Sequence, residues 1–298
     1  MRLLVAGASG FVGRRLCPAL KEAGHDVLAM TRRPENYRGA GEPVHGDVAD
    51  IGSLRDALKK VEIAYYLVHS LDSTDFQRRD ANAARAFARA AAEAGVRRIV
   101  YLGGLGDDAD SLSEHLASRR EVERLLAETG VPVTVLRAGI VIGHGGTSWE
   151  LTRQLVERLP AMVTPRWVGT RTQPIALADV VRYLAAMLEH PETEGRTFDI
   201  GGPEVLTYRD MLQRVAAIEG RLLAIVPVPF LSPRLSSYWL SLVTDIDATT
   251  GRALIDSMGN EVVVRDDAIR RIVEFEPMGY DDAVLQALGE RAKQRRTR

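Results

Sequence analysis

The stretch Gly7-Ala8-Ser9-Gly10-Phe11-Val12-Gly13 follows an apolar segment, Leu3–Ala6, and opens a segment of helical periodicity, Phe11–Ala23. Glycines at this spacing permit a tight turn between strand and helix and a close approach of the backbone to a pyrophosphate. The helix N-terminus adds free N–H donors and a positive dipole end. At the first strand-to-helix turn, this motif predicts a dinucleotide site rather than a turn without a ligand. The residues expected to bind the dinucleotide are Gly7, Ser9, Gly10, Phe11, Val12 and Gly13.

The first 140 residues alternate short, β-branched apolar runs with segments of helical period, which predicts βαβ units around a parallel sheet. The expected strands are Leu3–Ala6, Asp26–Met30, Pro43–His45, Ile63–Val68, Arg98–Leu102 and Val133–Arg137. The expected helices are Phe11–Ala23, Ile51–Lys60, Asp75–Ala94 and Ser113–Glu128. Gly24, Gly95 and Gly130 stand just past three of these helices, where left-handed C-terminal caps favour glycine.

Beyond about residue 145 the alternation loosens and prolines become more frequent. This half is expected to return a strand to the sheet, Arg196–Ile200, with helices at Ala178–Glu189 and Tyr208–Ile218. The sequence therefore predicts an α/β fold of the Rossmann type, a doubly wound parallel sheet with a smaller C-terminal α+β lobe. Residues 1–145 would form the dinucleotide-binding domain. Residues 146–298 would supply the remaining sheet, helices and a substrate or partner lobe, intertwined with the first part.

Composition narrows the class of protein. The chain has 298 residues, 46% of them hydrophobic, and a formal net charge of -1, so it carries no overall field that would gather nucleic acid. Its one cysteine, Cys17, cannot form an internal disulfide, and no apolar run approaches the roughly 20 residues that span a bilayer. These features predict a cytoplasmic protein without a transmembrane helix or a nucleic-acid partner.

The end of the second strand points to the identity of the dinucleotide. NAD-selective domains place an acidic residue there to bind the ribose 2′-hydroxyl, but this strand ends in Met30-Thr31-Arg32-Arg33. Arginine makes charge-assisted contacts to a 2′-phosphate and stacks on adenine. Thr31, Arg32 and Arg33 therefore favour NADP(H) over NAD(H), the alternative being two solvated arginines on an exposed turn.

Two residues after the third strand, Asp47 and Val48, are also expected to bind the cofactor. The Asp47 carboxylate would accept a hydrogen bond from the adenine amino group. The competing interpretation is a cap for the following helix, a role for which Asp50 or Ser53 is better placed.

With these motifs the chain resembles the extended short-chain dehydrogenase/reductase superfamily, and more closely its atypical branch of NmrA-like, YbjT-like and complex I accessory-subunit-like NAD(P)H-binding proteins. The further motifs that carry the resemblance are Gly46-Asp47-Val48, Asn82, Val135-Leu136-Arg137-Ala138-Gly139, Pro174-Ile175-Ala176-Leu177-Ala178-Asp179-Val180, Phe198-Asp199-Ile200-Gly201-Gly202-Pro203 and the tail Ser237–Thr244. It covers most of the chain and implies a nicotinamide cofactor, while the reaction of the YbjT-like proteins is poorly defined.

The chain departs from the family at the catalytic residues. Family enzymes carry a serine or threonine after the fifth strand, and a tyrosine four residues before a lysine. Here that strand ends in Leu102-Gly103-Gly104-Leu105, without a hydroxyl, and His115 and Arg119 stand at the tyrosine and lysine positions. His115 could exchange a proton, and Arg119 could hold the nicotinamide ribose or a substrate carboxylate. The alternative is a helix that keeps only its structural face and cofactor contacts.

Other residues carry weaker expectations. Val68 and His69 end the fourth strand and are expected to contact the cofactor, with a proton relay through His69 as a speculative addition. Asp107, Asp108 and Asp110 lack a metal-ligand spacing and are expected to form a solvated loop. Asp179, at the start of a helix, is expected to have a structural role as a carboxylate at the helix N-terminus. Pro227–Leu231, Tyr238, Trp239 and Leu242 could line a hydrophobic pocket or bind a partner, and the alternative, at least as well supported, is that they pack the small lobe on the main domain. Trp149 and Trp167 are expected to border the substrate cleft.

Three functions remain open at this point. The first is a hydride transfer between NADP(H) and an apolar carbonyl, alcohol or enone, with His115 or water managing the proton. The second is a non-catalytic protein that retains NADP(H) to sense redox state or stabilise an assembly, which the lost serine, tyrosine and lysine favour. The weakest is a nucleotide-sugar epimerase or dehydratase, because an epimerase needs the missing tyrosine.

Overall fold

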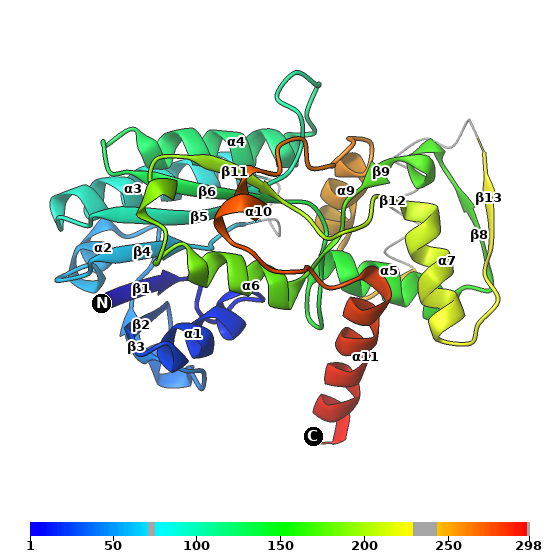
Figure 1. The fold of residues 1–298 in the computed structure, drawn as a ribbon, viewed down its shortest axis with the longest axis horizontal. Coiled ribbons are helices and arrows are strands. Elements are labelled where there is room, and N and C mark those ends of the chain that lie inside the picture. The colour runs from blue at the N-terminus through cyan, green and yellow to red at the C-terminus, as the bar shows by residue number, and fades with distance from the viewer. Residues whose placement is uncertain (71–74, 229–242, 297–298) are drawn as a thin grey trace.

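Seven parallel strands form the central sheet of the computed structural model, which describes residues 1–70, 75–228 and 243–296 (Figure 1). The strand order is β3-β2-β1-β4-β5-β6-β11. The strands are β1 (Arg2–Ala6), β2 (Asp26–Thr31), β3 (Glu42–His45), β4 (Ile63–Tyr66), β5 (Arg98–Gly104), β6 (Val133–Ala138) and β11 (Thr197–Ile200). The order reverses between β1 and β4, so the carboxyl ends of these two strands flank the crevice where such sheets bind ligands.

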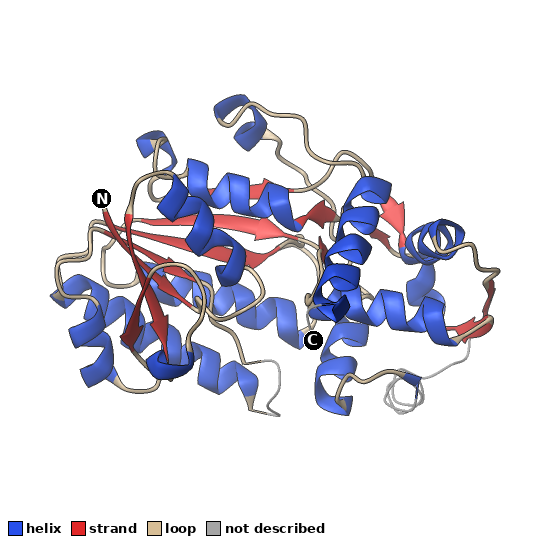
Figure 2. Ribbon diagram, turned by 90° about the horizontal axis from the view of Figure 1, so that it is seen from below, coloured by secondary structure: helices blue, strands red, loops and turns tan. Residues whose placement is uncertain are grey.

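Helices cover both faces of the sheet (Figure 2). One face carries α2 (Ile51–Ala57), α3 (Phe76–Glu93) and α4 (Glu114–Ala127), and the other carries α1 (Gly13–Glu22), α6 (Leu177–Ala186) and α10 (Ala268–Ile272). Side chains alternate between the two cores along β1, with Leu4 facing α2 and α3 while Leu3 and Val5 face α1 and α6. A strand that is buried on both faces needs a continuous apolar run, which explains why β1 reads as one.

A third core lies in the C-terminal lobe and is built largely from helices. These are α5 (Thr147–Arg158), α7 (Tyr208–Ile218), α9 (Ala248–Ser257) and α11 (Tyr280–Arg296). Short strands pair around them, namely β7 (Val141–Ile142) with β10 (Ile175–Ala176), β8 (Ala161–Thr164) with β13 (Ala224–Pro227), and β9 (Arg171–Thr172) with β12 (Leu206–Thr207). The single-turn 3₁₀ helices are η1 (Pro34–Asn36), η2 (Arg166–Gly169) and η3 (Pro191–Thr193).

The predicted α/β fold of the Rossmann type is confirmed, and most elements lie within a few residues of their expected bounds. Gly24, Gly95 and Gly130 have φ of 83°, 74° and 81°, as left-handed caps require. The helix expected over Ile51–Lys60 ends early, at Ala57. Lys60 adopts a φ of 62°, a left-handed conformation that no helix can include.

The two tryptophans predicted to border the cleft lie in the core of the C-terminal lobe instead. Trp149 is fully buried on α5, and Trp167 packs edge-on against Tyr208 with ring centroids 5.7 Å apart. Trp149 lies on α5 and Trp167 on η2, and both elements pack into this core. Tyr238, Trp239 and Leu242 lie outside the described residues, as do residues 229–231. In the described ranges, no helix is both long and apolar enough to cross a membrane.

Candidate cofactor and active site

The glycine loop forms a tight turn that requires glycine at Gly7 and Gly13. Gly7 has a φ of 88°, and its carbonyl accepts a hydrogen bond from Gly10 N at 2.9 Å. A Cβ atom on Gly13 would lie 2.3 Å from the Gly7 oxygen and 2.7 Å from the Ala8 Cα atom. The first residue of α1 is therefore pressed against the turn, which directs the amides of the helix N-terminus at the crevice between β1 and β4.

Some side chains of this loop are exposed to solvent, and others pack against the core. Ser9 is exposed, whereas Phe11 and Val12 pack against the core beneath α1 and α6. A Cβ atom on Gly146 would lie 2.6 Å from Phe11 Cζ, so the ring fills the space above that glycine. Phe11 and Val12 consequently can offer a cofactor polar contacts only through their backbone groups.

Two cations lie at the carboxyl end of β2, beside the glycine loop. Arg32 and Arg33 are exposed, and no carboxylate of the described ranges pairs with either guanidinium. Thr31 Oγ1 accepts a hydrogen bond from Arg33 N at 3.3 Å, which shapes the turn between β2 and η1. The backbone of Thr31 also accepts a hydrogen bond from Gly46 N, so β2 and β3 end together. This corner presents uncompensated positive charge.

Asp47 and Asp50 have separate roles at the start of α2. Asp50 caps the helix by accepting a hydrogen bond from Gly52 N at 2.9 Å. The Asp47 carboxylate accepts one from Ala49 N at 2.9 Å, and Asp47 N donates to Ser53 Oγ. The helix cap is therefore Asp50. Asp47 keeps one carboxylate oxygen without a described partner, next to the partly buried Val48.

The end of β4 contributes two kinds of residue. Tyr65 and Tyr66 are buried; the Tyr65 hydroxyl donates to the Leu184 carbonyl at 3.1 Å. Val68 packs against the core, while the side chain of His69 is exposed. Neighbouring protein still removes part of the water around the His69 imidazole, and this desolvation, together with the Arg119 charge, lowers the pKa of His69.

His115 and Arg119 lie one turn apart on α4 and contact each other, as their spacing predicts. Arg119 Nε donates to His115 Nε2 at 3.4 Å, and His115 Nδ1 lies 3.1 Å from Ser257 Oγ on α9. The Ser257 hydroxyl donates to the Ala253 carbonyl at 2.7 Å, so its oxygen is free to accept and Nδ1 carries the imidazole proton. Desolvation, Arg119 and His69 together lower the pKa of His115 to about 3. His115 is neutral near pH 7.

Arg119 and Leu116 occupy the space that a side chain at Gly104, near the end of β5, would fill. A Cβ atom on Gly104 would lie 3.0 Å from Leu116 Cδ2 and 3.4 Å from Arg119 Cγ, so glycine makes room for both residues. The Arg119 side chain is buried, with an exposed fraction of 7%. In the part of the chain that the structure describes, no carboxylate lies within ion-pairing distance of it. A nearly buried cation without an anion is unusual, which makes Arg119 a candidate ligand-binding residue.

The acidic loop after β5 exposes Asp108 and Asp110 to solvent and is also held by ion pairs. Asp108 pairs with Arg120 and Arg137, and Asp107 pairs with Arg265. Arg120 also donates to the carbonyls of Gly104 and Gly106, at 2.6 and 2.7 Å. Ion pairs distant in sequence thus anchor the loop beside Arg119. Among the residues described, no cluster of His, Cys, Asp and Glu could hold a metal ion.

Residues outside the predicted set complete this region. Ser257 and Asn260 come from the C-terminal lobe; Asn260 accepts from Ser113 N at 2.9 Å and donates to the Ser111 carbonyl. No local motif announces them, because they meet α4 only through the packing of α9. Asp179, read as architecture, accepts a hydrogen bond from Met278 N at 2.8 Å and joins α6 to the segment before α11.

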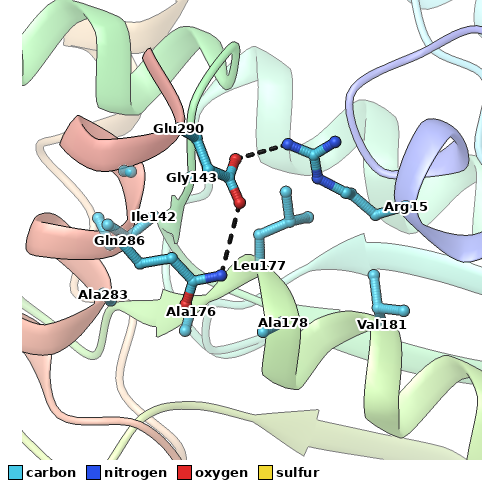
Figure 3. A pocket seen from close by; sticks show the side chains of 11 residues that line it. Arg15, Ile142, Gly143, Ala176, Leu177, Ala178, Val181, Ala283, Gln286 and Glu290 are labelled. Atoms are coloured by element: carbon cyan, nitrogen blue, oxygen red, sulfur yellow. Dashed lines mark hydrogen bonds and ion pairs between the residues drawn. The ribbon is translucent and has the colours of Figure 1, made fainter. Parts of the chain in front are cut away.

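A cavity of about 260 Å³ lies between α1, α6 and α11 (Figure 3). Its walls are mostly apolar, and Arg15 pairs with Glu290 across it, with Gln286 donating to the same carboxylate. None of the predicted site residues lines it. The ion pair already balances the charge of Arg15, so this cavity does not share the electrostatics of the Arg119 region.

The depressed pKa of His115 predicts a pH dependence of stability. A histidine in the unfolded chain has a pKa of about 6.5. Below that pH the unfolded chain binds a proton at His115, whereas the folded chain binds it only near its own pKa of about 3. Stability therefore falls with falling pH across this window. Between pH 7 and pH 5, urea titrations of the wild type should show about 2 kcal/mol more loss in the free energy of unfolding than those of His115→Gln. Equal losses would contradict the assignment; His45→Gln, which removes an exposed histidine elsewhere, should behave as the wild type.

The comparisons with known proteins agree with this geometry. The model of a family described as NAD(P)H-binding matches residues 7–191, from the glycine loop to the end of α6 and beyond. The (4-alkanoyl-5-oxo-2,5-dihydrofuran-3-yl)methyl phosphate reductase of Streptomyces griseus is 31% identical over 230 residues, which are 74% of each chain. Subunit 9 of the mitochondrial NADH dehydrogenase alpha subcomplex from Arabidopsis thaliana is 25% identical, over 70% of this chain and 56% of that protein.

A solved structure extends the similarity to nearly the whole fold. The triphenylmethane reductase of Citrobacter sp., crystallised with NADP(H), superposes with a TM-score of 0.78 over 96% of this chain and 100% of its own. Its sequence identity to this chain is 19%, so this similarity supports the fold alone.

Proposed function

The chain belongs to the NAD(P)H-binding family, and on this premise we propose that it is an oxidoreductase that uses NADP(H) to reduce an apolar ketone or enone. One arrangement carries the proposal. The Arg32–Arg33 corner after β2, the glycine loop after β1 and the group formed by His69, His115 and Arg119 beyond β4 follow one another along the carboxyl edge of the sheet. A dinucleotide laid along this edge meets positions for the 2′-phosphate, the pyrophosphate and hydride transfer in that order.

The chain's own groups would divide the work as follows. Backbone amides at Gly7–Gly13 bind the pyrophosphate, and Arg32 and Arg33 bind the 2′-phosphate that distinguishes NADP(H) from NAD(H). Thr31, Asp47 and Val48 line the adenosine end, and Val68 and His69 contact the nicotinamide ribose. The cofactor, when bound, supplies the hydride. Because His115 is neutral near pH 7 with its proton shared with Ser257, we assign the proton of the reaction to water.

The relatives support reduction over other chemistry. The Streptomyces relative is named as a reductase whose substrate contains an oxo-dihydrofuran ring, which is an unsaturated lactone. An epimerase would need a residue that takes a proton as the sugar is oxidised, and the Nε2 lone pair of His115, which would take it, already accepts a hydrogen bond from Arg119.

A non-catalytic sensor or assembly factor is the second candidate. It is favoured by the loss of the family's serine, tyrosine and lysine, and by the similarity to the NADH dehydrogenase subunit. A protein partner would find apolar surface on the C-terminal lobe, where Val163 and Val226 are cross-strand neighbours and both more than half exposed.

Consumption of NADPH separates the two candidates. We expect the purified protein to oxidise NADPH in the presence of 2-cyclohexenone or cyclohexanone, at rates on the order of 1 per second or below for such unselected substrates. The signal is the loss of absorbance of the reduced nicotinamide. Binding of NADPH without any turnover across a panel of ketones and enones would contradict the oxidoreductase and favour the sensor.

A further inference from the structure

We propose that Arg119 binds the substrate oxygen and stabilises the negative charge that hydride transfer places on it, with His115 and Ser257 as positioning residues. This inference rests on the proposed function and names its substrate class. A site that presents, among its described residues, a fixed cation and no carboxylic acid or protonated histidine favours a conjugated enone over a simple ketone.

The state of Arg119 is the first observation. Its side chain is 7% exposed, yet the only described hydrogen bond of its guanidinium is the one from Nε to His115. The adjacent Arg120 shows the contrast, because it pairs with Asp108 and donates to two backbone carbonyls. Arg120 is satisfied by the protein, whereas the two terminal amino groups of Arg119 remain for a ligand. Neither amino group is among the buried polar atoms that lack a partner, so both reach the solvent from which a ligand would come.

The contacts behind Arg119 are the second observation. The Ala253 carbonyl accepts from Ser257, Ser257 accepts from His115, and His115 accepts from Arg119 Nε. This chain runs from α9 to α4 and fixes the plane of the guanidinium. A guanidinium held at Nε keeps Nη1 and Nη2 in a fixed fork, which suits a planar oxyanion.

The third step is chemical. Reduction of a ketone adds hydride to the carbonyl carbon and yields an alkoxide, a strong base that requires a proton donor at once. Reduction of an enone adds hydride to the β-carbon; the electrons of the C=C bond move toward the carbonyl, and the charge settles on the enolate oxygen. The α-carbon then takes a proton from water and leaves hydroxide. The second route needs a cation during transfer and no acid in the protein, which matches the arrangement of the described residues around Arg119.

Arg119 could instead hold the nicotinamide ribose hydroxyls, the role of the family's lysine, and the two roles make opposite predictions. A ribose ligand contributes to affinity for NADP⁺ itself. An oxyanion ligand contributes only to what binds beside the cofactor. Measuring both affinities on the same variants distinguishes them.

The probe is p-nitrophenol, whose ionised form carries charge on an oxygen attached to a planar conjugated system, as an enolate does. Its absorbance reports ionisation directly. With NADP⁺ saturating, the wild type should bind the phenolate in preference to the phenol and so lower the apparent pKa of the probe. Arg119→Met should weaken phenolate binding at least tenfold, with NADP⁺ affinity within about twofold of the wild type. Arg119→Lys should retain part of the phenolate affinity.

Variants of the neighbours test the positioning role. His115→Phe should raise the apparent pKa of the bound probe, and His115→Gln, which can still accept from Arg119 and donate to Ser257, should restore it. Arg124→Met removes an exposed arginine from the same helix and should change nothing. Equal phenolate affinity in wild type and Arg119→Met, or a loss confined to NADP⁺ affinity, would overturn the inference. Failure to bind NADP⁺ at all would instead overturn the proposed function.

Discussion

Gly13→Val is expected to abolish binding of the nicotinamide cofactor while the sheet stays folded. The new Cβ atom would lie 2.3 Å from the Gly7 oxygen and 2.7 Å from Ala8 Cα, and both are backbone atoms that cannot rotate away. Relief requires the Gly7–Gly10 turn to open, which displaces the amides proposed to bind the pyrophosphate. Overpacking strain of about 3 kcal/mol at the loop corresponds to a loss in NADPH affinity of at least about 100-fold.

Two matched substitutions control for general damage. At Gly10 a Cβ atom would lie 3.1 Å from the Gly7 oxygen, so Gly10→Ala should lose less affinity than Gly13→Val. Gly24 has a φ of 83° with no atom within 4 Å of an added Cβ, so Gly24→Ala should cost about 1 kcal/mol of stability and no affinity. Circular dichroism and calorimetry measure fold and affinity. A folded Gly13→Val protein that binds NADPH normally would show that the loop is not the pyrophosphate site.

The fold follows from local signals that repeat along the chain. Strands buried on both faces, such as β1, read as continuous apolar runs, and glycines such as Gly24 and Gly95 end helices through their positive φ. These signals need only a few neighbouring residues. That is why the elements of the sheet were predictable and why the helix ending before Lys60, where the chain turns without a glycine, was not.

The site was predictable only where its residues are close in sequence. His115 and Arg119 contact each other because residues four apart share a helix face. Ser257, which sets the tautomer of His115, lies 142 residues away, and the pairing of Asp108 with Arg137 spans 29 residues. Neither contact has a local pattern, since both depend on how the lobe and the sheet pack. The tautomer of His115 therefore had to come from the structure.

Arg32→Ala is expected to weaken NADPH binding about 30-fold or more and to leave NADH binding within about twofold. A charge-assisted contact between guanidinium and phosphate contributes roughly 2 kcal/mol when the arginine has no competing carboxylate, which is the state of Arg32 within the described residues. Arg38→Ala is the matched control. Arg38 is also exposed after β2, but its guanidinium already donates to the carbonyls of Glu35 and Tyr37.

Calorimetric titration of the wild type and Arg32→Ala with NADPH and with NADH tests the central claim most directly. The account predicts that the wild type binds NADPH more tightly than NADH and that Arg32→Ala removes most of this difference. Binding of neither cofactor by the wild type, or equal affinity for both that Arg32→Ala leaves unchanged, would contradict it.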